Sequence, residues 1–66
     1  MKREHLIRER KERDLTSEQL AKAIGISKAM VSHIENGRHW PSGKVIIRLE
    51  KFFGIPASEL LAESEE

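Results

Sequence analysis

The stretch TSEQLAKAIGISKAMVSHIENG, from Thr16 to Gly37, predicts two short helices that meet at a glycine. Thr16 is a candidate N-cap for the first helix, and Gln19 three residues later completes a capping box. Apolar residues then recur on one helical face: Leu20, Ala21 and Ile24. Gly25 follows the last of them, and glycine readily takes the positive φ angle with which many helices end. The first helix is therefore expected to end at this glycine.

The second helix of this stretch has two different faces. Ser27 is a candidate N-cap, and Asn36 followed by Gly37 is expected to stop the helix. Val31 and Ile34 are expected to point inward. The opposite face presents one cation, one methyl group, one hydroxyl and one imidazole, from Lys28, Ala29, Ser32 and His33. Such a face is suited to contacting base edges in the major groove of DNA.

The stretch resembles the helix-turn-helix of the lambda/434-type phage repressors and Cro, in the xenobiotic-response-element (XRE) family of bacterial and phage transcriptional regulators. The resemblance is carried by Leu20-Ala21, Ile24-Gly25, Val31, Ile34 and Glu35-Asn36-Gly37. It extends to the charged segment Arg10–Arg13 and to Gly54-Ile-Pro-x-x-Glu-Leu-Leu61. It implies an all-α, compact five-helix, lambda-repressor-like domain whose second and third helices form the helix-turn-helix. It also implies a sequence-specific regulator, a repressor, that binds double-stranded DNA.

The resemblance also implies which residues contact DNA. Base contacts are expected from Lys28, Ala29, Ser32 and His33, with Lys28 donating to guanine and Ala29 touching a thymine methyl group. For His33, contact with a phosphate alone is the alternative. Phosphate contacts are expected from helix amino ends and from the loop after the second helix, namely Ser17, Ser27, Arg38, His39, Ser42, Gly43 and Lys44. A solvent-exposed face without any partner is the competing interpretation.

Length and composition restrict the class of protein. The 66 residues predict one DNA-binding domain, residues 1–62, followed by an acidic tail, residues 63–66. The absence of cysteine excludes disulfides and thiolate metal sites. Because the histidines lack metal-ligand spacing and no nucleophile-base pattern is present, we expect no enzyme activity, metal, cofactor or small-molecule ligand. No apolar run approaches the roughly 20 residues of a membrane span, so a cytoplasmic, nucleoid-associated protein is expected.

Positive charge gathers in the middle of the chain, although the net charge is only +1. Residues 19–48 carry five lysines and arginines against Glu35 alone. Residues 59–66 carry four glutamates and no lysine or arginine. This distribution indicates a surface for a polyanion on one side of the molecule. Ordinary solvated charges are the alternative.

The segment before the stretch, residues 2–13, is predicted to be a charged helix with Leu6 as its inward anchor. Asp14 follows it and is expected in the left-handed conformation that ends a helix. The resemblance implies that Arg10 reaches Glu35 in a partly buried ion pair, which would tie the first helix to the third. The alternative is that both side chains are solvated and contribute little to stability.

After the stretch, residues 38–44 are expected to form a loop, and residues 43–53 a helix with a wide apolar face. Trp40 is expected to close the lower edge of the core, with stacking on nucleic acid as the alternative. Pro56 is expected to open a short last helix. Within each of the pairs Phe52-Phe53 and Leu60-Leu61, one side chain is expected to be exposed.

The same carboxyl-terminal region is the expected site of self-association. A single domain reads few base pairs, so a homodimer on a palindromic operator is expected. Its interface is predicted at the last turn and helix, from Ile55, Pro56, Leu60 and Leu61. The alternative function is a protein-interaction module, such as an antitoxin-type partner, that binds through Phe52, Phe53, Leu60 and Leu61.

Overall fold

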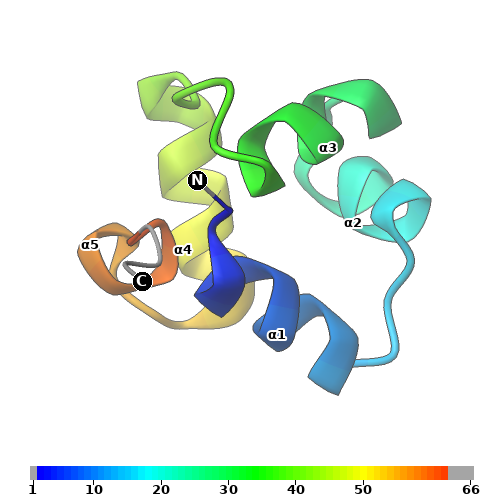
Figure 1. Ribbon diagram of the computed structural model, residues 1–66, viewed down its shortest axis with the longest axis horizontal. Coiled ribbons are helices and arrows are strands. Elements are labelled where there is room, and N and C mark those ends of the chain that lie inside the picture. Colours follow the sequence, from blue (N-terminus) through cyan, green and yellow to red (C-terminus); the bar gives the residue numbers. More distant parts are fainter. Residues whose placement is uncertain (1, 63–66) are drawn as a thin grey trace.

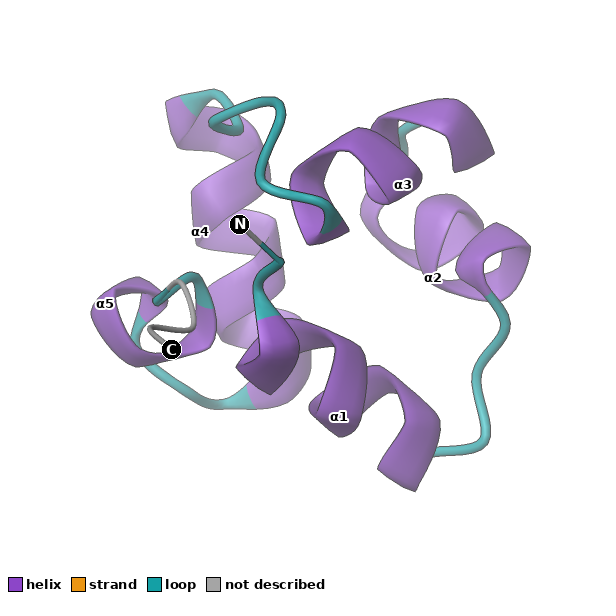
Figure 2. Ribbon diagram, viewed as in Figure 1, coloured by secondary structure: helices purple, strands orange, loops and turns teal. Residues whose placement is uncertain are grey.

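Five helices joined by short loops make up residues 2–62, which are the residues that the structure, a computed structural model, describes. They are α1 (Glu4–Glu12), α2 (Ser17–Ile24), α3 (Lys28–Glu35), α4 (Gly43–Phe53) and α5 (Ala57–Leu60), as Figure 1 shows. Figure 2 shows that the described part of the chain contains helices and loops but no strand. The predicted all-α, five-helix fold is therefore confirmed. The predicted acidic tail, residues 63–66, lies outside the described residues.

The boundaries of α2 and α3 are set by residues adjacent to them in the sequence. Thr16 Oγ1 accepts a hydrogen bond from Gln19 N at 3.1 Å, and Gln19 Oε1 accepts one from Thr16 N at 2.9 Å, which is the predicted capping box. Gly25 follows α2 with a φ of 75°. Ser27 Oγ caps α3 by accepting a hydrogen bond from Met30 N at 3.0 Å. Both helices of the helix-turn-helix therefore begin and end where the sequence predicts.

The first helix is shorter than predicted at both ends, because α1 spans Glu4–Glu12 rather than residues 2–13. Asp14 has a φ of 56°, which confirms the left-handed conformation expected of it. Arg13 donates a hydrogen bond to Phe53 O at 3.2 Å, and its guanidinium lies 4.8 Å from the centre of the Phe53 ring. The buried Leu6 supplies the apolar contact. Arg13, the residue that follows α1, therefore ties the end of this helix to the end of α4, and Leu6 anchors the helix in the core.

The last helix, α5, is a single turn that depends on other elements. Pro56 precedes it, as predicted, but provides no side-chain cap. Instead, Glu50 Oε2 of α4 accepts a hydrogen bond from Ala57 N at 2.7 Å. From α1, His5 Nδ1 lies 2.9 Å from Glu59 O, within hydrogen-bond distance. An isolated turn is unstable in water, so α5 depends on these contacts with α1 and α4 and on the burial of Leu60 in the core.

The hydrophobic core lies where the five helices meet. Every helix contributes to it, with Leu6 from α1, Leu20, Ala21 and Ile24 from α2, Val31 and Ile34 from α3, Leu49 and Phe53 from α4, and Leu60 from α5. The predicted inward faces of α2 and α3 are confirmed. Because both helices of the helix-turn-helix bury one face in this core, their opposite faces are fixed in direction.

The predicted exposure of the carboxyl-terminal leucines is wrong. Leu60 is 0% exposed and Leu61 is 3% exposed, so neither is accessible to the predicted dimer interface or to the alternative protein-interaction surface. The physical reason is that α5 packs against both α1 and α4, so two successive side chains at its end each meet apolar neighbours. Phe53 is also buried, at 5% exposed. Phe52, at 39% exposed, is the one accessible side chain among the four predicted for an interaction surface.

The expected role of Trp40 in closing the core is also wrong. Its side chain is 59% exposed, whereas the neighbouring Pro41 is buried. Pro41 lines a hollow together with Met30 and Val45, at the edge of the core that Trp40 was expected to close. Pro41 therefore takes the place at this edge that was expected of Trp40, and the indole ring lies outside, with the guanidinium of Arg3 at 5.2 Å from its centre.

Candidate nucleic-acid interface

Four side chains of α3 share one open face on the side opposite the core. They are Lys28, Ala29, Ser32 and His33, and all four are exposed. Val31 and Ile34 on the inward face are only 2% and 1% exposed. Ser32 Oγ accepts a hydrogen bond from Asn36 Nδ2 at 3.3 Å, which leaves the hydroxyl hydrogen available to a base or phosphate acceptor. In Figure 1, α3 lies along the upper edge of the molecule with α2 below it.

The predicted phosphate contacts lie at the amino ends of three helices. They are Ser17 in α2, Ser27 before α3, and Ser42, Gly43 and Lys44 at the start of α4. All are exposed except Ser17, which is half-buried. Ser42 Oγ accepts a hydrogen bond from Val45 N at 3.4 Å, so this hydroxyl can still donate to a phosphate oxygen. The unpaired N–H groups and the positive end of the dipole make each helix amino end favourable for an anion.

The loop between α3 and α4 carries the remaining two predicted phosphate contacts, Arg38 and His39, and both are exposed. Its start is fixed by Gly37, which has a φ of 75° and donates a hydrogen bond to Ile34 O at 3.1 Å. Arg38 N donates to His33 O at 2.9 Å. Figure 2 shows the loop leading from the end of α3 to the amino end of α4 at the upper edge of the molecule. The loop therefore leaves α3 in a defined direction.

The carboxyl end of α3 carries a buried carboxylate, since Glu35 is 6% exposed. A negative charge is unfavourable at this end of a helix dipole and needs a cationic partner. Arg10 Nε donates to Glu35 Oε2 at 2.7 Å, and Arg10 Nη2 donates to Glu35 Oε1 at 3.4 Å. Arg10 Nη1 also donates to Leu15 O at 2.8 Å. The ion pair implied by the family resemblance is present in the structure, and it joins α1 to α3.

A second arginine, which the sequence analysis did not single out, caps the same end of α3. Arg3 N donates to Glu35 O at 2.8 Å, and Arg3 Nη1 donates to Ile34 O at 2.6 Å. The residue is only 3% exposed. A guanidinium at a helix carboxyl end also complements the dipole. Arg3 stands in a run of charged residues, and no local pattern distinguishes it from its solvated neighbours.

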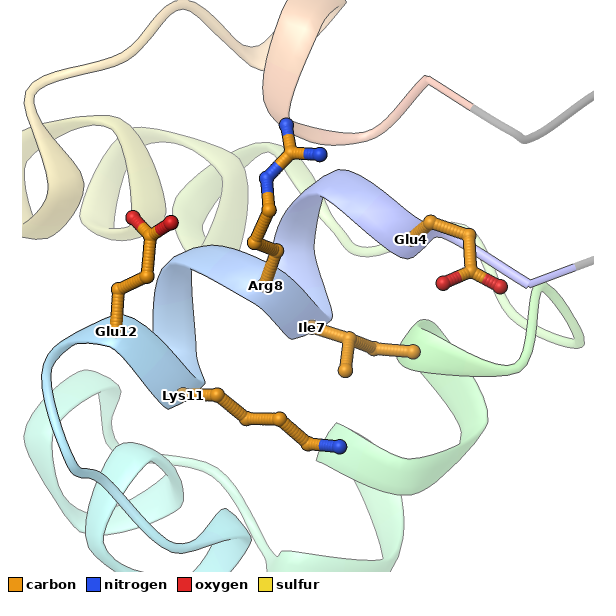
Figure 3. A pocket seen from close by; sticks show the side chains of 5 residues that line it. All are labelled: Glu4, Ile7, Arg8, Lys11 and Glu12. Atoms are coloured by element: carbon orange, nitrogen blue, oxygen red, sulfur yellow. The ribbon is translucent and has the colours of Figure 1, made fainter.

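The outer surface of α1 has a shallow hollow lined by Glu4, Ile7, Arg8, Lys11 and Glu12. Figure 3 shows Arg8 and Glu12 extending to one side of the helix, and Ile7 and Lys11 to the other. The hollow is therefore a space between side chains of one helix rather than a cleft between two elements.

Residues 2–62 contain no group of three histidines or acidic residues that could hold a metal ion. None of the described helices combines the length and the apolar character needed to cross a membrane.

Comparison with known proteins agrees with this arrangement of α2 and α3. The family described as Helix-turn-helix matches residues 6–60, which cover all of α2, α3 and α4. The chain belongs to the XRE-type helix-turn-helix family. Members of this family are DNA-binding transcriptional regulators and do not form an enzyme class.

Three relatives illustrate the similarity. The chain is 39% identical to the cryptic phage CTXphi transcriptional repressor RstR of Vibrio cholerae over 56 residues, which are 85% of this chain and 50% of the relative. It is 34% identical over 53 residues to an uncharacterized HTH-type transcriptional regulator of Methanocaldococcus jannaschii, with 80% of each chain covered. It is 48% identical over 40 residues to the ImmF control region 10 kDa protein of Bacillus phage phi105, which covers 61% of this chain and 44% of the relative. The chain thus spans half or less of the length of two of these relatives.

Proposed function

We propose that this chain is a sequence-specific, double-stranded DNA-binding repressor whose helix α3 enters the major groove. The observation that carries the proposal is the division of α3 into two faces, with Val31 and Ile34 in the core and the four small or polar side chains exposed. A helix used in this way must be held rigidly, and Arg3 and Arg10 fasten its carboxyl end. The similarity to a relative that is named as a transcriptional repressor is the reason for proposing repression.

In the proposed complex, backbone contacts set the position of the domain on the duplex. The cations among residues 19–48 attract the DNA, and the amino ends of α2 and α4 then meet phosphates. Arg38 and His39 extend the same contact along the loop. These contacts carry no sequence information themselves, but they hold α3 at the depth and angle that base contacts require.

Sequence preference is assigned to the exposed face of α3. Lys28 is at the first position of the helix, where its ammonium can donate to guanine O6 and N7. Ala29 beside it offers a methyl group to a thymine methyl. Ser32 and His33, one turn further on, address the next base or a phosphate. Each good base contact contributes roughly 1–3 kcal/mol of discrimination.

We also propose that the domain binds a palindromic operator as a homodimer, with half-sites about one helical turn, ~34 Å, apart. The burial of the carboxyl-terminal leucines moves the interface to the turn after α4. There Ile55 is half-buried, Pro56 is exposed, and Phe52 at the end of α4 is 39% exposed. Sedimentation of the free protein and of its complex with a two-half-site duplex tests this step. A single protomer in both samples would contradict it.

The DNA-binding proposal is tested by selecting bound sequences from a random duplex pool and then measuring affinity for the selected duplex over a range of salt concentrations. Lys28→Ala is expected to weaken binding roughly 5- to 150-fold and to relax the preference at one base pair, because it removes a base contact. Arg38→Ala is expected to weaken binding to all sequences alike and to reduce the salt slope by about one, because it removes a phosphate contact.

A matched control comes from α1. Lys11 is exposed on α1, so Lys11→Ala removes the same charge from a helix that contributes no residue to the proposed interface. It is expected to leave affinity, salt slope and preference almost unchanged. If Lys28→Ala and Arg38→Ala behave like this control while circular dichroism shows both variants folded, α3 is not the DNA-binding helix.

A further inference from the structure

The side chain of Arg3 joins three parts of the chain that are far apart in the sequence. Its Nη1 atom donates to Ile34 O at 2.6 Å and to His39 O at 2.9 Å. Its Nε atom donates to Leu61 O at 3.2 Å. One buried guanidinium therefore connects the end of α3, the loop after it and the end of α5.

The loop after α3 is gripped by Arg3 at two neighbouring residues. The carbonyl of His39 accepts its hydrogen bond, and the ring of Trp40 lies over its guanidinium at 5.2 Å. The indole is nevertheless 59% exposed, so its position is not explained by burial in the core. The contact between the Arg3 guanidinium and the indole ring is the interaction that holds Trp40 in this position.

One nitrogen atom of Arg3 adds a side-chain link between α3 and the loop to the backbone hydrogen bonds of Gly37 and Arg38. Because Nη1 of Arg3 contacts Ile34 O and His39 O together, the end of the base-contacting helix and the start of the phosphate-contacting segment cannot move apart without breaking one of these two hydrogen bonds. His39 itself accepts this hydrogen bond, and the exposed Arg38 stands directly before it in the loop.

We propose that Arg3 is a positioning residue for DNA binding, which presets the loop after α3 so that phosphate contacts form together with base contacts. This inference rests on the proposed function. The planar guanidinium is required, because its nitrogens donate hydrogen bonds to three carbonyls while its flat face contacts the indole ring of Trp40. An ammonium group carries the same charge but offers neither the fork nor the planar face.

Arg3→Lys tests the proposal because it keeps the positive charge. Affinity and salt slope are measured on the selected duplex, and the exposure of Trp40, the only tryptophan, is followed by fluorescence quenching without DNA. We expect binding to weaken roughly 5- to 10-fold from lost preorganisation. We expect about one to two phosphate contacts to be lost, which lowers the slope of log K against log [salt] by about 0.9 for each contact. We also expect Trp40 to become more accessible to the quencher.

Arg8→Lys, an exchange of the same type at an exposed position of α1, is the matched control and is expected to change none of the three readouts. If Arg3→Lys lowers stability but leaves the salt slope and the affinity per folded molecule unchanged, Arg3 is merely structural and the proposal is overturned. It is equally overturned if no Arg3 variant folds at any temperature, because the residue then serves the fold itself. Failure of the wild-type protein to bind any duplex would instead refute the proposed function, and the quenching experiment would still report whether Arg3 holds the loop.

Discussion

The ion pair between Arg10 and Glu35 offers the sharpest test of how α3 is held. The perturbation is a double-mutant cycle with Arg10→Met, Glu35→Leu and the two changes combined. The side chains of Arg10 and Glu35 are 13% and 8% exposed, so water reaches neither freely. Each replacement keeps much of the apolar volume while it removes the charge.

The expected magnitudes follow from which charge is left without its partner. Arg10→Met leaves the less exposed carboxylate of Glu35 at the unfavourable end of the α3 dipole, so the free energy of unfolding should fall by about 3 kcal/mol, the lower part of the range for buried pairs. Glu35→Leu leaves an arginine that keeps its bond to Leu15 O and is the more exposed of the two side chains, so a smaller loss of about 1–2 kcal/mol is expected. The double variant strands neither charge and should lie within about 1 kcal/mol of the wild type.

Urea denaturation followed by circular dichroism measures these differences. A 66-residue domain has a total stability of roughly 3–10 kcal/mol, so the loss in Arg10→Met is a large fraction of the whole and is easily resolved. The pair of Glu9 in α1 with Arg13 just after it is the control, because Arg13 is 36% exposed and its coupling with Glu9 should be much smaller. Small, additive effects of the two single changes, with no recovery in the double variant, would refute the reasoning.

Three further predictions concern the core, a helix cap and acid stability. Leu60→Ala should lower the free energy of unfolding by about 2–5 kcal/mol, and the same change at the exposed Phe52 by much less, as urea titration would show. Thr16→Ala should cost about 1 kcal/mol, measured in the same way, because the cap of α2 is lost. The hydrogen bond from Arg13 lowers the pKa of Glu9 from its ordinary value of 4.5. A carboxyl group whose pKa is lowered in the folded state adds stability at pH values above its unfolded-state pKa. This stability is lost as the pH falls through its folded-state pKa. Thermal unfolding should therefore show the advantage of wild type over Glu9→Gln shrinking below pH 4.5; a constant difference would contradict this.

The parts of the fold that the sequence predicts are those fixed by neighbouring residues. The capping box of Thr16, the left-handed Gly25 and the left-handed Asp14 each involve residues within a few positions of one another. Such local interactions leave a pattern of residue types that can be recognised without coordinates. The wide apolar face likewise predicted a helix over residues 43–53, and α4 has these bounds.

The features that the sequence did not predict depend on which segments meet in space. Leu61 is buried because α5 folds back against α1 and α4, and at the core edge Pro41 is the buried residue while Trp40 is exposed. The hydrophobicity of the residues predicts neither the burial of Leu61 nor the exposure of Trp40, since leucine and tryptophan are both found in buried and in exposed positions. Burial at the end of a short helix is decided by its neighbours, and those become known only once the helices are placed.

The two ends of α3 differ in whether neighbouring or distant residues fix them, and this difference bears on the proposed function. Its amino end is set by Ser27, one residue away, so the exposed residues of its first turn can be predicted from the sequence. Its carboxyl end is set by Arg3 and Arg10, which reach it across 31 and 25 residues. The local cap sets where α3 begins, burial of Val31 and Ile34 turns the opposite face outward, and the two arginines hold its carboxyl end against the rest of the domain. Affinity for DNA should therefore depend on two arginines of the amino-terminal segment that the structure shows bonded to α3 rather than presented on its open face.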